Sequence, residues 1–209
     1  MKNQLDKFEF EVLLSCMNQD GFEIAYKSKI DSDLLIINQC DKEDYQEAEV
    51  NGHLWRMIST KERGLSKSRN MALKSARGEI CLFADDDEVF SDELQSQVLD
   101  AFGRNENASM IAFNLNRINV PMKKTYYRII TEKISNRRFG SPMTAIRLKD
   151  ILKNNICFNE MFGSGSPWGG GEDGLFQCDI RKNHLLIYEC PSIIATIDYS
   201  NESKWFHGY

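Results

Sequence analysis

The chain has 209 residues and a formal net charge of −5 at pH 7. That length suffices for one α/β domain with a sizeable core and is short for two domains of ordinary size. The acidic balance argues against general nucleic-acid binding, which needs clustered lysine and arginine side chains to neutralise phosphates. We therefore expect a single domain over residues 1–209 and no nucleic-acid partner.

One local basic cluster departs from this balance. Lys123, Lys124, Arg137 and Arg138 lie in a polar stretch at 116–140, which reads as a mobile loop or a lid. The cluster suits a solvated face, or a contact with phosphates or an anionic membrane surface. The N-terminus lacks a signal-peptide pattern, and no apolar run approaches the ~20 residues of a spanning helix. We expect a cytoplasmic protein, with any membrane contact peripheral and at the inner face.

Short apolar runs alternate with helix-like segments through the first half of the chain. In chain order we predict a strand at 9–15, a helix at 22–30, strands at 33–38 and 54–59, a helix at 65–76 and a strand at 79–84. This order is typical of right-handed βαβ units, and therefore of an α/β fold whose mostly parallel central sheet is flanked by helices. In such sheets, ligands bind beyond the carboxyl ends of the strands.

The second half of the chain has a looser pattern. Apolar spacing predicts a helix over 94–102, and a short helix follows Asp173. Further strands are predicted near 110–115, 143–147, 185–189 and 193–197. No internal repeat or low-complexity segment interrupts these elements.

Three adjacent aspartates, Asp85, Asp86 and Asp87, directly follow the predicted strand at 79–84. Adjacent carboxylates repel one another, so at the end of a buried strand they are unfavourable unless a cation neutralises them. Ligand sets made only of oxygen suit magnesium or manganese, and such an ion can hold a diphosphate. The alternative is a solvated turn whose carboxylates lie near a helix N-terminus.

A second carboxylate pair, Glu172 and Asp173, ends a glycine-rich segment at 163–171. Glycines permit close backbone approach, and Trp168 within the segment offers an apolar face for a sugar ring. Asp173 could instead cap the helix that follows. Together with the acidic run, this pair indicates a two-part active site.

Residues 63–70 read Arg-Gly-Leu-Ser-Lys-Ser-Arg-Asn, a turn followed by the start of a helix. Arg69 could reach a phosphate and Asn70 a base or a ribose, with a surface salt bridge as the alternative for Arg69. The sequence has no Walker loop, no nucleophile elbow and no dinucleotide glycine motif after the first strand.

Taken together, the chain resembles the family 2 glycosyltransferases, nucleotide-sugar-dependent enzymes of GT-A fold. The resemblance covers nearly the whole chain and rests on the order and spacing of five segments: the first strand with Ser15, residues 64–70, the acidic run at 85–87, residues 139–142 and residues 171–173. It implies one GT-A (Rossmann-like) domain, with a donor half over about 1–105 and an acceptor half over about 106–209.

The resemblance also implies a role for each matching side chain. Asp173 would be the general base that takes a proton from the acceptor hydroxyl. Asp87, helped by Asp85, would hold a divalent ion, Mn²⁺ or Mg²⁺, that stabilises the departing diphosphate. The donor-binding residues would be Ser15, Asn38, Gln39, Arg69, Asn70, Asp85 and Asp86. The acceptor-binding residues would be Trp168, Gly170 and Glu172.

Three departures from the family pattern accompany the resemblance. Many relatives carry an aspartate at the end of the second strand, where this chain has Asn38 and Gln39. Many also carry a carboxylate at the position of Ala84. A late histidine near the metal is frequent, whereas the matching region here offers Asp198, with His207 further along.

We therefore expect an inverting, metal-dependent glycosyltransferase that moves a hexosyl or N-acetylhexosaminyl group. The donor would be a UDP-sugar, and the acceptor a glycan or a lipid-linked molecule in bacterial surface polysaccharide synthesis; UDP and the pathway follow from the resemblance alone. Two alternatives stay open: a non-catalytic module of GT-A fold that binds a sugar nucleotide or glycan, and a sugar-phosphate nucleotidyltransferase. The latter normally carries a glycine-rich basic loop after the first strand, which residues 15–19 do not form.

Overall fold

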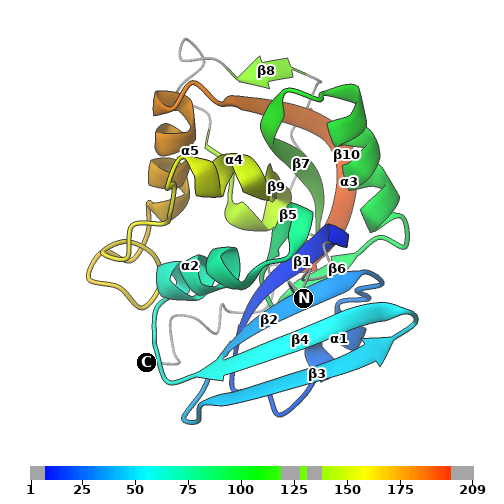
Figure 1. The fold of residues 1–209 in the computed structure, drawn as a ribbon, viewed down its shortest axis with the longest axis vertical. Helices are drawn as coiled ribbons and strands as arrows, with labels where there is room; N and C mark the ends of the chain where they lie inside the picture. The colour runs from blue at the N-terminus through cyan, green and yellow to red at the C-terminus, as the bar shows by residue number, and fades with distance from the viewer. Residues whose placement is uncertain (1–7, 119–127, 131–137, 199–209) are drawn as a thin grey trace, which may run out of the picture.

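The structure is a computed structural model that describes residues 8–118, 128–130 and 138–198. Within these residues, ten strands form one sheet with the order β3-β4-β2-β1-β5-β9-β7-β10-β6, and β8 pairs with β10 (Figure 1). The strands are β1 (Phe8–Met17), β2 (Asp33–Gln39), β3 (Asp44–Val50), β4 (His53–Thr60), β5 (Gly78–Ala84), β6 (Glu88–Phe90), β7 (Ala108–Ile118), β8 (Arg128–Ile130), β9 (Thr144–Arg147) and β10 (Leu186–Asp198).

Helices cover both faces of this sheet. They are α1 (Glu23–Lys27), α2 (Leu65–Ser75), α3 (Leu94–Arg104), α4 (Leu148–Lys153) and α5 (Glu172–Lys182), with a 3-10 helix, η2 (Ser141–Met143). Side chains of α1 and α3 share one hydrophobic core with the sheet, and those of α2, α4 and α5 share a second core with it. Figure 1 shows α3 on one side of the strands and α2, α4 and α5 on the other.

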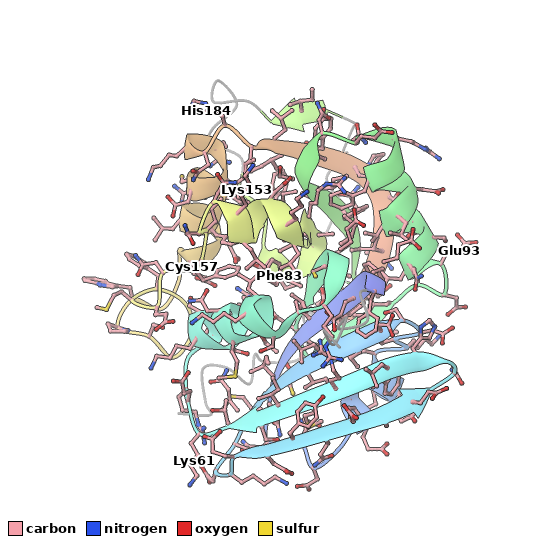
Figure 2. All side chains as sticks on the ribbon, in the orientation of Figure 1. Lys61, Phe83, Glu93, Lys153, Cys157 and His184 are labelled. Atoms are coloured by element: carbon pink, nitrogen blue, oxygen red, sulfur yellow. The ribbon has the colours of Figure 1, made fainter. Side chains whose placement is uncertain are left out.

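The two cores follow from the alternation of side chains along the strands. Val12 and Leu14 of β1 face the α1/α3 core, whereas Leu13 between them faces the α2/α4/α5 core. This is the period of two expected for a strand covered on both faces, where nearly every residue is apolar. Phe83 of β5 accordingly lies in the interior, whereas Lys61 and Glu93 lie at the periphery (Figure 2).

The predicted α/β domain is confirmed, and its sheet is mixed. The pairs β4-β2, β2-β1, β1-β5 and β7-β10 are parallel. Strand β9 is antiparallel to both β5 and β7, and β3, β6 and β8 add antiparallel neighbours. The two last predicted strands form one strand, β10, whose pairing with β7 shifts register between Glu189 and Ile193. Strand β3 was not predicted, because most of its side chains are exposed and polar.

The parallel core brings the carboxyl ends of β1, β2 and β5 to one edge of the sheet. Cys16 pairs with Asn38, and Leu14 pairs with Ala84, the residue before the acidic run. Both predicted strand-end segments therefore lie at the edge where ligands bind in such sheets.

Part of the predicted polar stretch lies outside the described residues. Of the basic cluster, Lys123, Lys124 and Arg137 lie outside the described residues, and Arg138 lies within them. No helix in the described parts of the chain is long and apolar enough to cross a membrane.

Candidate active site

The second carboxylate pair begins a helix. Gly171 has φ 101°, a left-handed conformation that glycine adopts without strain, and it turns the chain into α5. Glu172 and Asp173 therefore occupy the first turn of α5, where the partial positive charge of the helix end favours carboxylates. The cap position belongs to Gly171 and makes no side-chain hydrogen bond, so Asp173 does not cap the helix.

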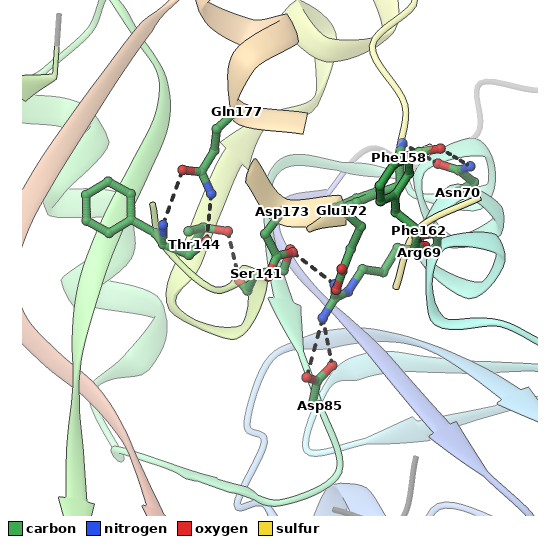
Figure 3. Close-up of polar contacts among 12 residues, drawn as sticks. Arg69, Asn70, Asp85, Ser141, Thr144, Phe158, Phe162, Glu172, Asp173 and Gln177 are labelled. Carbon is green, nitrogen blue, oxygen red and sulfur yellow. Dashed lines mark hydrogen bonds and ion pairs between the residues drawn. The ribbon is translucent and has the colours of Figure 1, made fainter. Parts of the chain in front are cut away.

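Arg69 of α2 joins the two acidic segments, as Figure 3 shows. Its Nη1 donates to Asp173 Oδ1 at 3.0 Å and to Glu172 Oε1 at 3.4 Å. Its Nη2 donates to the two carboxylate oxygens of Asp85 at 3.3 and 3.4 Å. The guanidinium also lies over the Phe158 ring, 5.5 Å from its centroid. Arg69 thus forms salt bridges. They are buried, unlike the surface salt bridge that the sequence left open, because only 3% of the Arg69 surface is exposed.

One guanidinium faces three carboxylates, so the cluster carries excess negative charge. Burial raises the pKa of Asp85 to about 6. Arg69 opposes this rise, and the charges of Asp87 and Asp173 add to it. Burial, followed by repulsion from Asp173, also raises the pKa of Glu172. A cation brought to this cluster would relieve the repulsion.

Asp173 has a second donor in Ser141, the first residue of η2. Ser141 Oγ donates a short hydrogen bond to the same oxygen, Oδ1, that Arg69 contacts. Gln177, one turn beyond Asp173 on α5, bonds both backbone groups of Phe139, at 3.2 and 2.6 Å. The segment that carries Ser141 is therefore held against α5. Among the described residues, no hydrogen bond reaches Asp173 Oδ2.

Sequence reasoning noted the motif at 139–142 but assigned no role to Ser141 or Gln177. It also assigned no role to Glu88, the acidic residue that follows the aspartate run. Glu88 is 1% exposed, and its Oε2 accepts the backbone N–H of Asp85 at 3.1 Å. Burial, followed by repulsion from Asp85, raises the pKa of Glu88 well above its usual value. Glu88 therefore restrains the turn at 86–87 as a buried carboxyl group.

Three of the predicted donor-binding residues lie at the strand ends and bond to nearby segments. Asn38 accepts the N–H of Gln19 at 2.9 Å and donates to its carbonyl at 2.7 Å. Gln39 Oε1 accepts the N–H of Gly64 at 2.8 Å. Ser15 accepts a bond from a serine hydroxyl of α2 at 2.8 Å. These contacts shape the edge of the sheet, and direct contact of the three residues with a donor stays a prediction.

A cavity of about 290 Å³ opens beside this edge. It lies beyond the carboxyl ends of β1 and β2, next to the loop that Asn38 holds. Its lining residues are Asn18, Gln19, Asp20, Cys40, Asp41 and Lys42. Most of these side chains are polar, which suits the hydrogen-bonding edge of a nucleobase.

The predicted acceptor side forms a surface loop that leads into α5. Trp168 is 62% exposed, and its ring stacks on Phe162 with 6.4 Å between centroids. Gly170 donates its N–H to the Trp168 carbonyl at 2.8 Å. The N–H of Leu65 at the start of α2 bonds Ser164 O at 2.9 Å, which ties the loop to the site.

The carboxylates of the acidic run are chemically suited to bind a divalent ion. Asp85 and Asp87 offer only oxygen ligands, and the repulsion that Asp87 exerts on Asp85 is what such an ion would relieve. No group of three or more His, Cys, Asp or Glu within the described part of the chain could hold a metal ion. Of the two candidates for a further ligand, Asp198 ends β10, and His207 lies outside the described residues.

Comparison with known proteins identifies the family. The profile of glycosyl transferase family 2 matches residues 11–168. The chain belongs to this family. The chain is 28% identical over 131 residues to an uncharacterized glycosyltransferase of Haemophilus influenzae. The aligned region covers 58% of this chain and 45% of that protein.

Solved structures of TarS from S. aureus share the fold of this family 2 member. TarS 1-349 in complex with UDP-GlcNAc has a TM-score of 0.69 and 19% identity, covering 97% of this chain and 62% of that chain. Its complex with UDP has a TM-score of 0.66 and 20% identity, covering 91% and 60%. These matches confirm the predicted GT-A fold. The chain spans only about half to three fifths of the length of these relatives.

Proposed function

We propose that this family 2 glycosyltransferase transfers a hexosyl or N-acetylhexosaminyl group from a UDP-sugar, with inversion, to a glycan or lipid-linked acceptor in bacterial surface polysaccharide synthesis. One observation carries the proposal: a single guanidinium holds Asp85 of the acidic run and Asp173 of α5 in one site. The structural relatives bound to UDP-GlcNAc and UDP support the choice of nucleotide. The transfer reaction would take place in the cytoplasm. The protein would contact the inner face of the membrane peripherally where a lipid-linked acceptor presents its hydroxyl.

The donor would lie along the carboxyl edge of the sheet. Its base would occupy the cavity beyond β1 and β2, and its ribose or sugar would meet Asp86. Asp87, with Asp85, would hold Mn²⁺ or Mg²⁺ beside the diphosphate. When bound, the ion supplies positive charge that stabilises the leaving group. The remaining ligands of such an ion would come from diphosphate oxygens and water.

Asp173 would take the proton of the acceptor hydroxyl. Arg69 and Ser141 both donate to Oδ1, so Oδ2 would be the oxygen that accepts the proton. As the O–H bond breaks, the acceptor oxygen bonds to the anomeric carbon and the bond to the diphosphate breaks. One displacement of this kind inverts the anomeric configuration. Glu172 and Gly170 would position the acceptor, and Trp168 offers an exposed ring for a sugar to stack on.

Calorimetric titration with UDP, GDP, CDP and dTDP, each with manganese and with EDTA, tests this proposal. We expect UDP to bind selectively and only with manganese, and a panel of UDP-sugars then to reveal one that is hydrolysed or transferred. Binding of none of the four nucleotides would contradict the proposal. Binding of UDP without turnover of any UDP-sugar would favour the non-catalytic binding module.

A further inference from the structure

We infer that Arg69 and Asn70 are positioning residues that join α2 to the acceptor half of the chain, and that neither binds the nucleotide. The inference rests on the proposed function and revises the role that the sequence suggested for this pair. Arg69 and Asn70 are neighbours on α2 and are 3% and 5% exposed. Each makes its polar contacts with segments that lie far along the chain.

Both terminal nitrogens of Arg69 are engaged by this chain. They donate to carboxylates, and Phe158 covers one face of the Arg69 guanidinium. A phosphate could approach only by displacing these carboxylates, which themselves repel a second anion. Arg69 therefore offsets part of the negative charge of the site from within rather than binding the donor.

The side chain of Asn70 is likewise engaged by this chain. Its Oδ1 accepts the N–H of Phe158 at 2.8 Å, and its Nδ2 donates to the Phe158 carbonyl at 2.9 Å and to Glu160 at 3.0 Å. An amide has only two N–H donors, and both have partners here. The side chain thus has no donor left with which to read a base or a ribose.

A pair of stacked rings connects Asn70 to the helix of Asp173. The Phe158 ring, which Asn70 fixes through the backbone, stacks on Phe176 of α5 with centroids 4.2 Å apart and planes 2° from parallel. Phe176 lies one helical turn beyond Asp173. The two neighbours on α2 therefore reach the proposed base by two routes: Arg69 directly, and Asn70 through a pair of stacked rings.

The shape of the arginine side chain matters for this role. A planar guanidinium presents separate nitrogens to Asp85 and to Asp173, so it fixes the separation of the two carboxylates. A lysine ammonium carries its charge on a single nitrogen, so it would bind one of these carboxylates and lose contact with the other. Displacement of a reacting group by about 1 Å costs roughly 10²-fold in rate.

The test compares Arg69→Lys and Asn70→Asp with the wild type, using kcat, the donor KM and the Kd of UDP with manganese. For Arg69→Lys we expect kcat to fall about 10²-fold while the Kd of UDP changes less than about 3-fold. For Asn70→Asp we expect kcat to fall about 10-fold with unchanged preference among UDP, CDP and GDP. Asn70→Asp keeps the shape of the side chain, so it preserves the test if Arg69→Lys fails to fold.

Arg56→Lys is the matched control. Arg56 is also a buried arginine, paired with Glu11 at 2.6 Å, and none of its contacts reaches the acidic cluster. We expect this change to lower stability while kcat and the Kd of UDP stay at wild-type values.

Two results would overturn the inference. A rise of about 10-fold or more in the Kd of UDP for Arg69→Lys would show that Arg69 binds the nucleotide. A changed nucleotide preference for Asn70→Asp would show that Asn70 reads the base. Both leave the proposed function standing, whereas a wild-type protein that binds no nucleotide would overturn the proposed function and this inference together.

Discussion

Two buried arginines, Arg56 on β4 and Arg69 on α2, differ in how their charge is balanced. Arg56 of β4 pairs with one carboxylate, Glu11, at 2.6 Å, and the other oxygen of Glu11 accepts two backbone N–H groups at 2.6 and 2.9 Å. Arg69 faces three carboxylates at 3.0 to 3.4 Å. The first arrangement is charge-balanced and joins elements of the fold. The second is short of positive charge, as a site that receives a cation should be.

The largest loss of activity should come from a change among the three carboxylates around Arg69. Changing Asp173 to Asn keeps the shape of the side chain but removes its ability to accept a proton. We expect kcat to fall by about 10² or more while the donor still binds, because proton transfer contributes to the transition state and little to donor affinity. Transfer assays and calorimetry with UDP measure the two effects. Full activity of this variant would mean that another group is the base.

A change in the Arg56–Glu11 pair should affect stability rather than activity. Changing Arg56 to Met leaves Glu11 as a buried charge without its partner, which costs about 3–5 kcal/mol of unfolding free energy. Urea unfolding measures this loss, and kcat per folded molecule should equal that of the wild type. A variant that stays stable but loses turnover would contradict the division between the two arginines.

A smaller effect should appear in the pH dependence of stability. The pKa of Asp85 is about 6 in the folded protein and 3.8 when unperturbed, so the folded state holds more protons between these values. The free energy of unfolding should therefore fall as pH rises from about 4 to about 6, by an amount on the order of 2 kcal/mol.

The Asp85→Asn variant isolates this contribution. It has no titrating group at this position, so its stability relative to the wild type should rise through the same pH window and then level off. Unfolding in EDTA at a series of pH values measures the difference. Parallel curves for the two proteins would show that Asp85 titrates normally.

The smallest effect should come from Ser141. Changing it to Ala removes one donor from Asp173 and leaves Arg69 in place, so kcat should fall about 5-fold, the equivalent of one hydrogen bond. Ser109→Ala is the control. Ser109 is a buried serine of β7, away from the site, and it donates to the carboxylate of Asp150 on α4 at 2.7 Å. Equal losses of kcat in both variants would mean that Ser141 has only a structural role.

The sequence predicted the parallel core well and its edges poorly. Buried strands such as β1 and β5 are apolar runs, and these are readable because burial on both faces demands them. Strand β3 lies at the end of the sheet, where most of its side chains face solvent and no apolar pattern is needed. The helix predicted over 22–30 is shorter, Glu23–Lys27, because the chain turns at Lys29 with φ 54°.

For the candidate site, the sequence identified the two acidic segments but not their partner. Asp85 and Asp173 were recognisable from a strand end and a glycine-rich turn. The family resemblance suggested a donor contact for Arg69, and nothing in its own segment points to the carboxylates 16 and 104 positions away that it contacts. Ser141 and Glu88 were overlooked for a related reason, since their roles depend on which groups burial brings within reach.

By itself, the sequence determined the type of fold and the two acidic segments, because hydrophobic period and local residue chemistry follow from neighbours along the chain. The order of its motifs carried the resemblance to the family. Only the tertiary structure decided how charge is distributed. It placed one arginine among three carboxylates and raised the pKa of Asp85. The reason is physical: electrostatic energies depend on separation in space and on burial, and both are set only when distant segments pack together.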